Sequence, residues 1–144
     1  MKEIKSKDII LDTAEKLFAQ KGYAGTSMRV IAEEAGTAQA LIHYHYKTKE
    51  FLFESIVERR SKVINGNRQQ RLRDCFEMEK NRFPSLEAIM ESFIQPALEC
   101  GRSSWGRDYS QILAKLANSD DERSRELVHK YYDPIAREYI LALE

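Results

Sequence analysis

The sequence predicts an all-α protein, in which an N-terminal three-helix domain containing a helix-turn-helix is followed by a C-terminal helical bundle. Apolar residues recur every three or four positions along most of the chain, which is the period of a helix that buries one face. The 144 residues include only 3 Pro, and 32% of them are charged, as is typical of a helical globular protein. Between residues 26 and 49, two short helical patterns lie only about four residues apart, which is the spacing of a helix-turn-helix. We therefore expect the fold to be arranged around this pair of helices.

The first helix is expected over residues 7–21, with Ser6 as its N-cap. Its buried stripe consists of Ile10, Ala14, Leu17 and Phe18. Gly22 follows the last turn and should end the helix, because glycine adopts the left-handed conformation that terminates helices. The role predicted for this helix is structural: it forms the floor on which the helix-turn-helix packs.

The two short helices come next. The apolar face of the first consists of Met28, Ile31, Ala32 and Ala35. Thr26 or Ser27 stands just before this face and can cap it, and Gly36 follows where a left-handed residue would end it. The helical pattern of the second is formed by Ala40, Leu41 and Tyr44. Ala38 is a poor cap for this helix, so Thr37 is expected to serve instead.

Helical periodicity continues through the second part of the chain. Thr48 is expected to cap a long helix that runs to about residue 80 and is weakened at Gly66. Ser85 should cap the next helix, whose end is marked by the segment from Pro96 to Gly101. An amphipathic helix then begins near residue 109.

Two final helices are expected toward the end of the chain. Ser119 or Asp120 should cap the first of them, in which the helical pattern resumes at residue 122. Pro134 should break or kink it, because proline has no N–H to donate within a helix. A last helical run follows over residues 135–143.

The charge of the chain gives little information about its partner. Its formal net charge is zero, and residues 1–47 hold seven Lys and Arg against six Asp and Glu. A DNA-binding prediction therefore depends on where the charges lie and not on their sum. No apolar segment approaches the roughly 20 residues that span a bilayer, and the charged N-terminus does not look like a secretory signal. We expect a cytoplasmic protein without a membrane partner, and its two cysteines, Cys75 and Cys100, to be reduced thiols.

The run from Ile10 to Leu52 resembles the DNA-binding domain of the tetracycline-repressor (TetR) family of regulators. The residues that carry the resemblance are Ala14, Leu17, Phe18, Gly22, Tyr23, Thr26, Ile31, Ala32, Ala35, Gly36, Tyr44, His45, Tyr46, Lys49 and Leu52. It implies a DNA-binding domain at residues 1–47 and an effector-binding and dimerisation domain at residues 48–144. Members of the family generally continue into two more helices that form a dimer interface. The sequence shows no candidates for these helices, so we expect the second domain to be incomplete.

The resemblance also suggests which side chains contact DNA, and their chemistry suits that role. Hydroxyl, imidazole and cationic groups bind phosphates, whereas Arg, Gln and small apolar side chains read base edges. His43 departs from the family, which often has a phosphate-binding Tyr there, and a protonated His43 would bind phosphate more strongly. The predicted DNA-binding residues are Ser27, Arg29, Gln39, Ala40, His43, Tyr44, Lys47 and Lys49.

By the same resemblance, large side chains of the second half are expected to line an effector pocket between helices. The alternative, which stays open for each of them, is that they only fill a core. The candidates are Phe76, Met90, Phe93, Trp105, Tyr109 and Tyr131.

The function implied is a ligand-responsive transcriptional repressor that binds a palindromic DNA operator as a homodimer and responds to a small-molecule effector. An alternative is a helical ligand- or partner-binding protein that keeps the motif as a scaffold. We expect no enzyme, because the sequence shows no catalytic constellation and no glycine-rich phosphate loop. No cofactor or metal is expected either, since His43 and His45 are spaced by two and fall on different helix faces.

Overall fold

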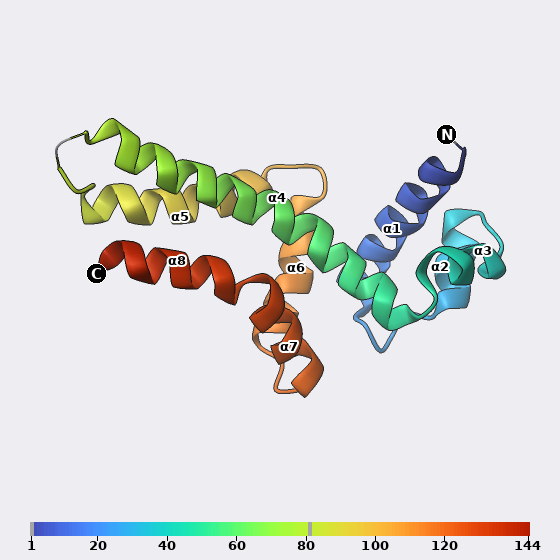
Figure 1. Cartoon of the computed structure of the whole chain (residues 1–144). Helices are drawn as coiled ribbons and strands as arrows, with labels where there is room; N and C mark the ends of the chain where they lie inside the picture. The colour runs from blue at the N-terminus through green and yellow to red at the C-terminus, as the bar shows by residue number, and fades with distance from the viewer. Residues whose placement is uncertain (1, 81) are drawn as a thin grey trace.

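A computed structural model describes residues 2–80 and 82–144, and these residues form eight α-helices and no strand, which confirms the all-α fold class. The helices are α1 (Lys2–Lys21), α2 (Met28–Ala35), α3 (Gln39–Tyr46), α4 (Lys49–Met78), α5 (Leu86–Gly101), α6 (Gly106–Ala117), α7 (Glu122–Tyr131) and α8 (Asp133–Leu143). Figure 1 shows α4 as the long axis, with α1–α3 at its N-terminal end and α5 and α8 beside its C-terminal half. Helices α6 and α7 lie between these two groups. None of the helices in the described ranges is both long and apolar enough to cross a membrane.

Helix α1 is longer than predicted. Its stripe of Ile10, Ala14, Leu17 and Phe18 is buried as expected. However, the helix begins at Lys2 and not near residue 7, so Ser6 lies inside it and the prediction that Ser6 caps it is wrong. The Ser6 hydroxyl instead donates to the carbonyl of Lys2, at 2.9 Å, as serine side chains do within helices.

The caps of the two short helices differ in kind. Ser27 caps α2 as predicted, accepting a hydrogen bond from the N–H of Val30 at 3.2 Å, and Gly36 closes it at φ 66°. The prediction that Thr37 caps α3 is wrong, because the N-cap is Ala38, which makes no side-chain hydrogen bond. The N–H of Thr37 donates to the carbonyl of Ala32, at 3.0 Å, so Thr37 belongs to the end of α2.

Helices α4 and α5 run without interruption past residues that were expected to weaken or end them. Thr48 caps α4 by accepting from the N–H of Phe51 at 3.0 Å, and the helix continues through Gly66. Helix α5 continues through the buried Pro96, and its packing along α4 offsets the hydrogen bond that proline cannot donate. Ser85 caps α5 as predicted.

The cap of α7 lies one residue beyond the predicted positions. Asp121, not Ser119 or Asp120, is the N-cap, and its carboxylate accepts from the N–H of Ser124 at 2.9 Å. Hydrogen bonds from Ser119 and Ser124 lower the pKa of Asp121 to about 2. The break at Pro134 is confirmed, since α7 ends at Tyr131 and proline lies in the first turn of α8.

One large apolar core runs from α1–α3 through the first half of α4 to α6 and α7. A smaller cluster formed by Ile89, Ile135 and Tyr139 joins α5 to α8. The α1–α3 region, which we call the head, therefore shares its core with the middle of the molecule. This shared core fixes where the head lies relative to α6 and α7.

Candidate nucleic-acid interface

Helix α3 has a buried side and an exposed side. Ile42 is fully buried and Tyr46 nearly so, and the Tyr46 hydroxyl donates to the carbonyl of Lys7 at 3.0 Å. Burial raises the pKa of Tyr46 to about 12. The buried side therefore consists of Ile42 and Tyr46, whereas Tyr44, one of the predicted DNA-binding residues, is 63% exposed. This packing leaves the opposite side of α3 free for a partner.

The exposed side of α3 carries four of the predicted DNA-binding residues close together. The amide nitrogen of Gln39 lies 3.4 Å from Nε2 of His43, and Nδ1 of His43 lies 3.2 Å from the carbonyl of Lys47. Because a carbonyl only accepts, the neutral imidazole carries its proton on Nδ1 and accepts at Nε2 from Gln39. The Lys47 amine lies 5.7 Å from the ring centroid of Tyr44. We call Gln39, His43, Tyr44 and Lys47 the α3 outer surface.

A tight turn leads from α3 to α4. Lys47 has φ 62°, which is uncommon for a residue other than glycine, and the N–H of Thr48 donates to the carbonyl of Tyr46 at 2.6 Å. The contact between His43 and the Lys47 carbonyl holds the same turn from the side of α3. Non-glycine residues with such backbone angles cluster at functional sites. The turn brings the N-terminus of α4 next to the α3 outer surface.

Lys49 lies at this helix N-terminus. Its amine is 4.2 Å from the ring centroid of Tyr23, so the side chain packs over the loop between α1 and α2 and is half-buried. A helix N-terminus and a nearby ammonium together suit a phosphate, which would compete here for the N–H groups of Glu50 and Phe51 that donate to the Glu50 carboxyl and the Thr48 hydroxyl. Glu50 follows in the same turn, where its own backbone N–H and the Tyr23 hydroxyl lower the pKa of its carboxyl.

Ser27 and Arg29 lie at the other helix N-terminus of the head, on α2. The Arg29 guanidinium is 3.8 Å from Glu33, and both side chains are largely exposed. Such an exposed ion pair contributes little to stability, so Arg29 is free to exchange it for a phosphate or a base edge. Ala40 is exposed at the start of α3. The structure thus places all eight predicted residues on exposed or half-exposed positions of α2, α3 and the start of α4.

The six side chains predicted to line an effector pocket do not surround a common cavity. Phe76 and Met90 are each about 40% exposed, on α4 and α5. Phe93 packs against the ring of Tyr139 at 4.9 Å, and Trp105 stacks on the guanidinium of Arg60 at 4.0 Å.

The remaining two of these residues are held by hydroxyl contacts. Tyr109 is buried against Tyr132, and Tyr131 donates to Glu54 at 2.7 Å. The six predicted residues therefore take part in several separate contacts, because side chains packed along one half of the long helix α4 do not reach those packed along the other half. The chain does enclose a cavity of about 260 Å³, but it lies between the head and helices α6 and α7.

The contacts of Arg123 could not be found from the sequence. Its Nη1 donates to the Tyr23 hydroxyl at 2.8 Å, which joins α7 to the loop between α1 and α2. One hundred residues separate the two partners, and no local pattern signals such a pair. In the described parts of the chain, no group of three His, Cys, Asp or Glu side chains could hold a metal ion.

Family models match both parts of the chain. Residues 10–56 match bacterial regulatory proteins of the tetR family, and residues 91–144 match a tetracyclin repressor-like C-terminal domain. A crystal structure of a TetR-family transcriptional regulator from Rhodococcus sp. has a similar fold, with a TM-score of 0.63 at 20% identity over 99% of this chain and 70% of that one.

Curated relatives match only part of the chain. The Probable HTH-type transcriptional regulator YttP of Bacillus subtilis is 44% identical over 55 residues, which are 38% of this chain and 27% of YttP. The biofilm operon icaADBC HTH-type negative transcriptional regulator IcaR of Staphylococcus epidermidis is 40% identical over 52 residues, which are 36% of this chain and 28% of IcaR. The chain therefore matches little more than a quarter of the length of these relatives. Since the two family models lie in the head and in the C-terminal helices of the matching fold, the chain belongs to the tetR family of bacterial regulatory proteins.

Proposed function

We propose that this protein is a transcription regulator that binds an operator through the α3 outer surface and acts as a repressor. The observation that carries the proposal is the two-sided character of α3. Ile42 and Tyr46 anchor one side in the core, while Gln39, His43 and Tyr44 are exposed on the other. A short helix held in this way, with polar groups outward, suits the major groove of DNA. A regulator of bacterial DNA acts in the cytoplasm.

The exposed residues of the head divide into two kinds of contact. Gln39 and Ala40, at the N-terminal end of α3, are placed to meet base edges, where Gln pairs with adenine and Ala touches a thymine methyl. Ser27, Tyr44 and Lys49 are placed to bind phosphates on either side of the groove. Arg29 is placed to bind either a base edge or a phosphate, and His43 and Lys47 are placed to bind phosphates. Phosphate contacts position the helix, and base contacts select the operator sequence.

A homodimer on a palindromic operator is part of the proposal. Large apolar side chains remain exposed along α5 and α8, at the end of the molecule opposite the head. They are Leu86, Met90, Ile94, Leu98, Ile140, Leu141 and Leu143. Exposed apolar side chains gathered on neighbouring helices typically mark an interface. Pairing there would leave two heads free to read half-sites about 34 Å apart.

Repression and a ligand response complete the proposal. The name of IcaR describes a negative regulator, and the 40% identity to it over 52 residues supports repression by this protein as well. We assign DNA binding to residues 1–47 and dimerisation and effector binding to residues 48–144. A small molecule that favours one arrangement of the heads would change operator affinity by a coupling free energy of about 1–3 kcal/mol.

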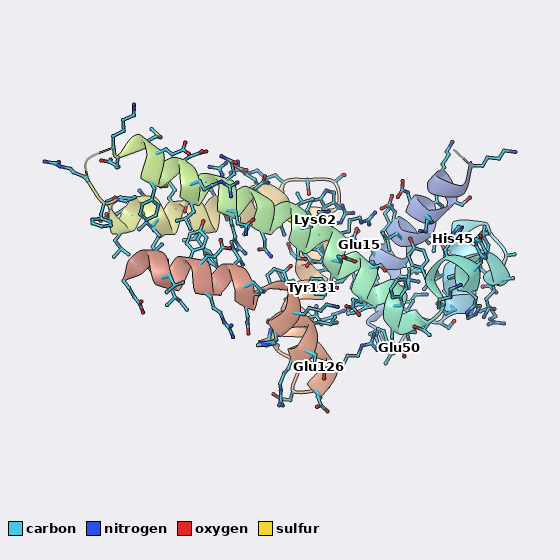
Figure 2. The ribbon with its side chains drawn as sticks, in the orientation of Figure 1. Glu15, His45, Glu50, Lys62, Glu126 and Tyr131 are labelled. Atoms are coloured by element: carbon cyan, nitrogen blue, oxygen red, sulfur yellow. The ribbon has the colours of Figure 1, made fainter. Side chains whose placement is uncertain are left out.

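Fluorescence anisotropy with DNA from upstream of the protein's own gene tests the proposal. The variants Gln39→Ala, His43→Ala and Lys49→Ala should each weaken operator binding about 5- to 150-fold, since each removes about 1–3 kcal/mol of contact free energy. Binding by the wild type should fall steeply with added salt, because phosphate contacts release counterions. Lys62→Ala is the matched control: Figure 2 shows Lys62 on the middle of α4, away from α2 and α3. Unchanged affinity in all three head variants would favour the scaffold alternative.

A further inference from the structure

The cavity between the head and the C-terminal helices has an apolar interior. We call it the junction cavity. Its volume is about 260 Å³, slightly below the roughly 300–1,000 Å³ of most ligand pockets, so it would hold only a small molecule. The side chains of its interior come from α1, the following loop, α4, α6 and α7. They are Phe18, Tyr23, Phe53, Ile112, Leu116 and Leu127.

The rim of the junction cavity is cationic. Lys115 and Arg123 both line it. The Lys115 amine donates to the carbonyl of Ala19 at 3.0 Å, and an ammonium has three N–H groups, so two remain for another acceptor. Asp121 also lies at the rim, but its carboxylate already accepts hydrogen bonds from Ser119 and Ser124 as the cap of α7. Because two cations face this one carboxylate, the net charge of the rim is positive.

Arg123 connects this rim to the DNA-binding end of the molecule. Its Nη1 donates to the Tyr23 hydroxyl at 2.8 Å and lies 3.6 Å from the carboxylate of Glu50. The Tyr23 hydroxyl in turn donates to Glu50 at 3.0 Å. Figure 2 shows Glu50 in the first turn of α4, at the end of that helix nearest α3. Arg123, Tyr23 and Glu50 therefore tie α7 to the loop between α1 and α2 and to the first turn of α4, which directly follows α3.

The contact between Arg123 and Glu50 is easily exchanged for a contact between Arg123 and another anion. The side chain of Glu50 is 60% exposed and that of Arg123 is 35% exposed, and ion pairs in contact with water are weak. An anionic group that enters the cavity mouth would bind the same guanidinium in a drier environment, where charge-assisted hydrogen bonds are stronger. A ligand can therefore take Arg123 away from Glu50.

We propose that the junction cavity binds a small aromatic or aliphatic carboxylate, whose apolar part fills the interior and whose anionic group binds Arg123 and Lys115. Binding exchanges the Arg123–Glu50 contact for an Arg123–ligand contact and so loosens α7 from the base of the head. The ligand then lowers operator affinity. The location and the chemistry of the site stand on the geometry alone, whereas its regulatory consequence rests on the proposed function.

Isothermal titration calorimetry with 2-naphthoate, on the protein without DNA, tests the site. We expect a dissociation constant on the order of 0.1 mM for an aromatic acid of this size. The neutral analogue 2-naphthamide should bind at least tenfold more weakly. Arg123→Gln should also weaken 2-naphthoate binding at least tenfold, because it removes the guanidinium from the rim.

Two further variants distinguish binding inside the cavity from binding elsewhere on the surface. Arg125→Gln makes the same charge change two residues along α7, outside this cavity, and should leave 2-naphthoate binding within twofold of the wild type. Ser124→Phe should block binding by filling the cavity, and it retains the backbone N–H that Asp121 caps. Circular dichroism of each variant checks that the helices are intact. No binding by the wild type, or equal binding by wild type, Arg123→Gln and Ser124→Phe, would overturn the site.

Operator binding measured with and without 2-naphthoate tests the coupling. Saturating ligand should weaken operator binding by the wild type fivefold or more and should have no effect on Ser124→Phe. If the ligand binds the cavity but operator affinity does not change, the regulatory part of the inference is wrong. If the wild type binds no DNA, the proposed function fails, while the calorimetry still decides the ligand site.

Discussion

His43 shows how one side chain of the head can serve two purposes. In its neutral form it donates from Nδ1 to the Lys47 carbonyl and accepts from Gln39 at Nε2. The ring therefore supports the turn after α3 and also orients the Gln39 amide on the exposed side of the helix.

We predict that His43→Phe weakens operator binding about tenfold, because a ring without nitrogen atoms supports neither the turn nor the Gln39 amide, and each lost hydrogen bond costs about 0.5–1.5 kcal/mol. Anisotropy titrations at constant pH and ionic strength measure the difference. Circular dichroism checks that the helices of the variant are intact. Equal affinity of wild type and His43→Phe would show that the ring nitrogens of His43 do not contribute to operator binding.

Helices α1 and α4 are joined by a buried ion pair. The guanidinium of Arg60 donates from Nε and Nη2 to the two carboxylate oxygens of Glu15, at 2.8 and 2.7 Å. Both residues are buried, and the ring of Trp105 covers the guanidinium. Figure 2 shows Glu15 where α1 passes α4. The pair fixes the angle at which the head meets the long helix, because its two hydrogen bonds are directional.

Removing one partner of this ion pair should lower the free energy of unfolding far more than removing both partners. We expect Arg60→Met to lower the free energy of unfolding by about 3 kcal/mol, because the buried Glu15 carboxylate then keeps only its longer contact with Arg59, at 3.5 Å. The double variant Glu15→Leu, Arg60→Met should recover most of this loss, since an apolar pair of similar volume is often nearly neutral. Urea denaturation followed by circular dichroism measures all three proteins. A double variant as unstable as Arg60→Met would mean that packing, not charge, decides the effect.

The whole molecule is bipolar, with a polar head at one end and exposed apolar side chains at the other. Helices α5 and α8 bury Ile89, Ile135 and Tyr139 between them, yet Ile140 and Leu141 on α8 are 57% and 68% exposed. Monomeric soluble proteins rarely leave so many large apolar side chains exposed to solvent. Its distance from the α3 outer surface would let two copies associate without hiding either head.

We predict that the double variant Ile140→Glu, Leu141→Glu shifts self-association of the chain toward monomer, because charges are depleted from the centres of interfaces. Sedimentation velocity over a range of concentrations measures the shift. The exposed positions should tolerate the change with little loss of stability. Affinity for a palindromic operator should fall with dimerisation, while affinity for an isolated half-site should not. An unchanged oligomeric state would place any interface elsewhere.

Much of the head can be predicted from the sequence alone, because its signals there are local. Apolar spacing is enough to indicate the buried stripe of α1, and a serine before a helical pattern or a glycine after one indicates the ends of α2 at Ser27 and Gly36. Exposure of Gln39 and His43 follows from the same periodicity. The errors at the start of α1, at Thr37 and at Asp121 are boundary errors of one to several residues, where several capping side chains compete.

Which distant residues meet depends on the tertiary structure. Whether Tyr109 lines a pocket or fills a core is set by how α6 packs against its neighbours, and the fold buries it beside Tyr132. The Arg123–Tyr23 contact and the junction cavity exist because α7 returns to the base of the head. Periodicity indicates which side of a helix is buried, but not which helix packs against it, because the apolar face of one helix can pack against that of many others. The sequence is therefore sufficient to predict the two short helices of the head, whereas the cavity beside them exists only through the packing of α6 and α7.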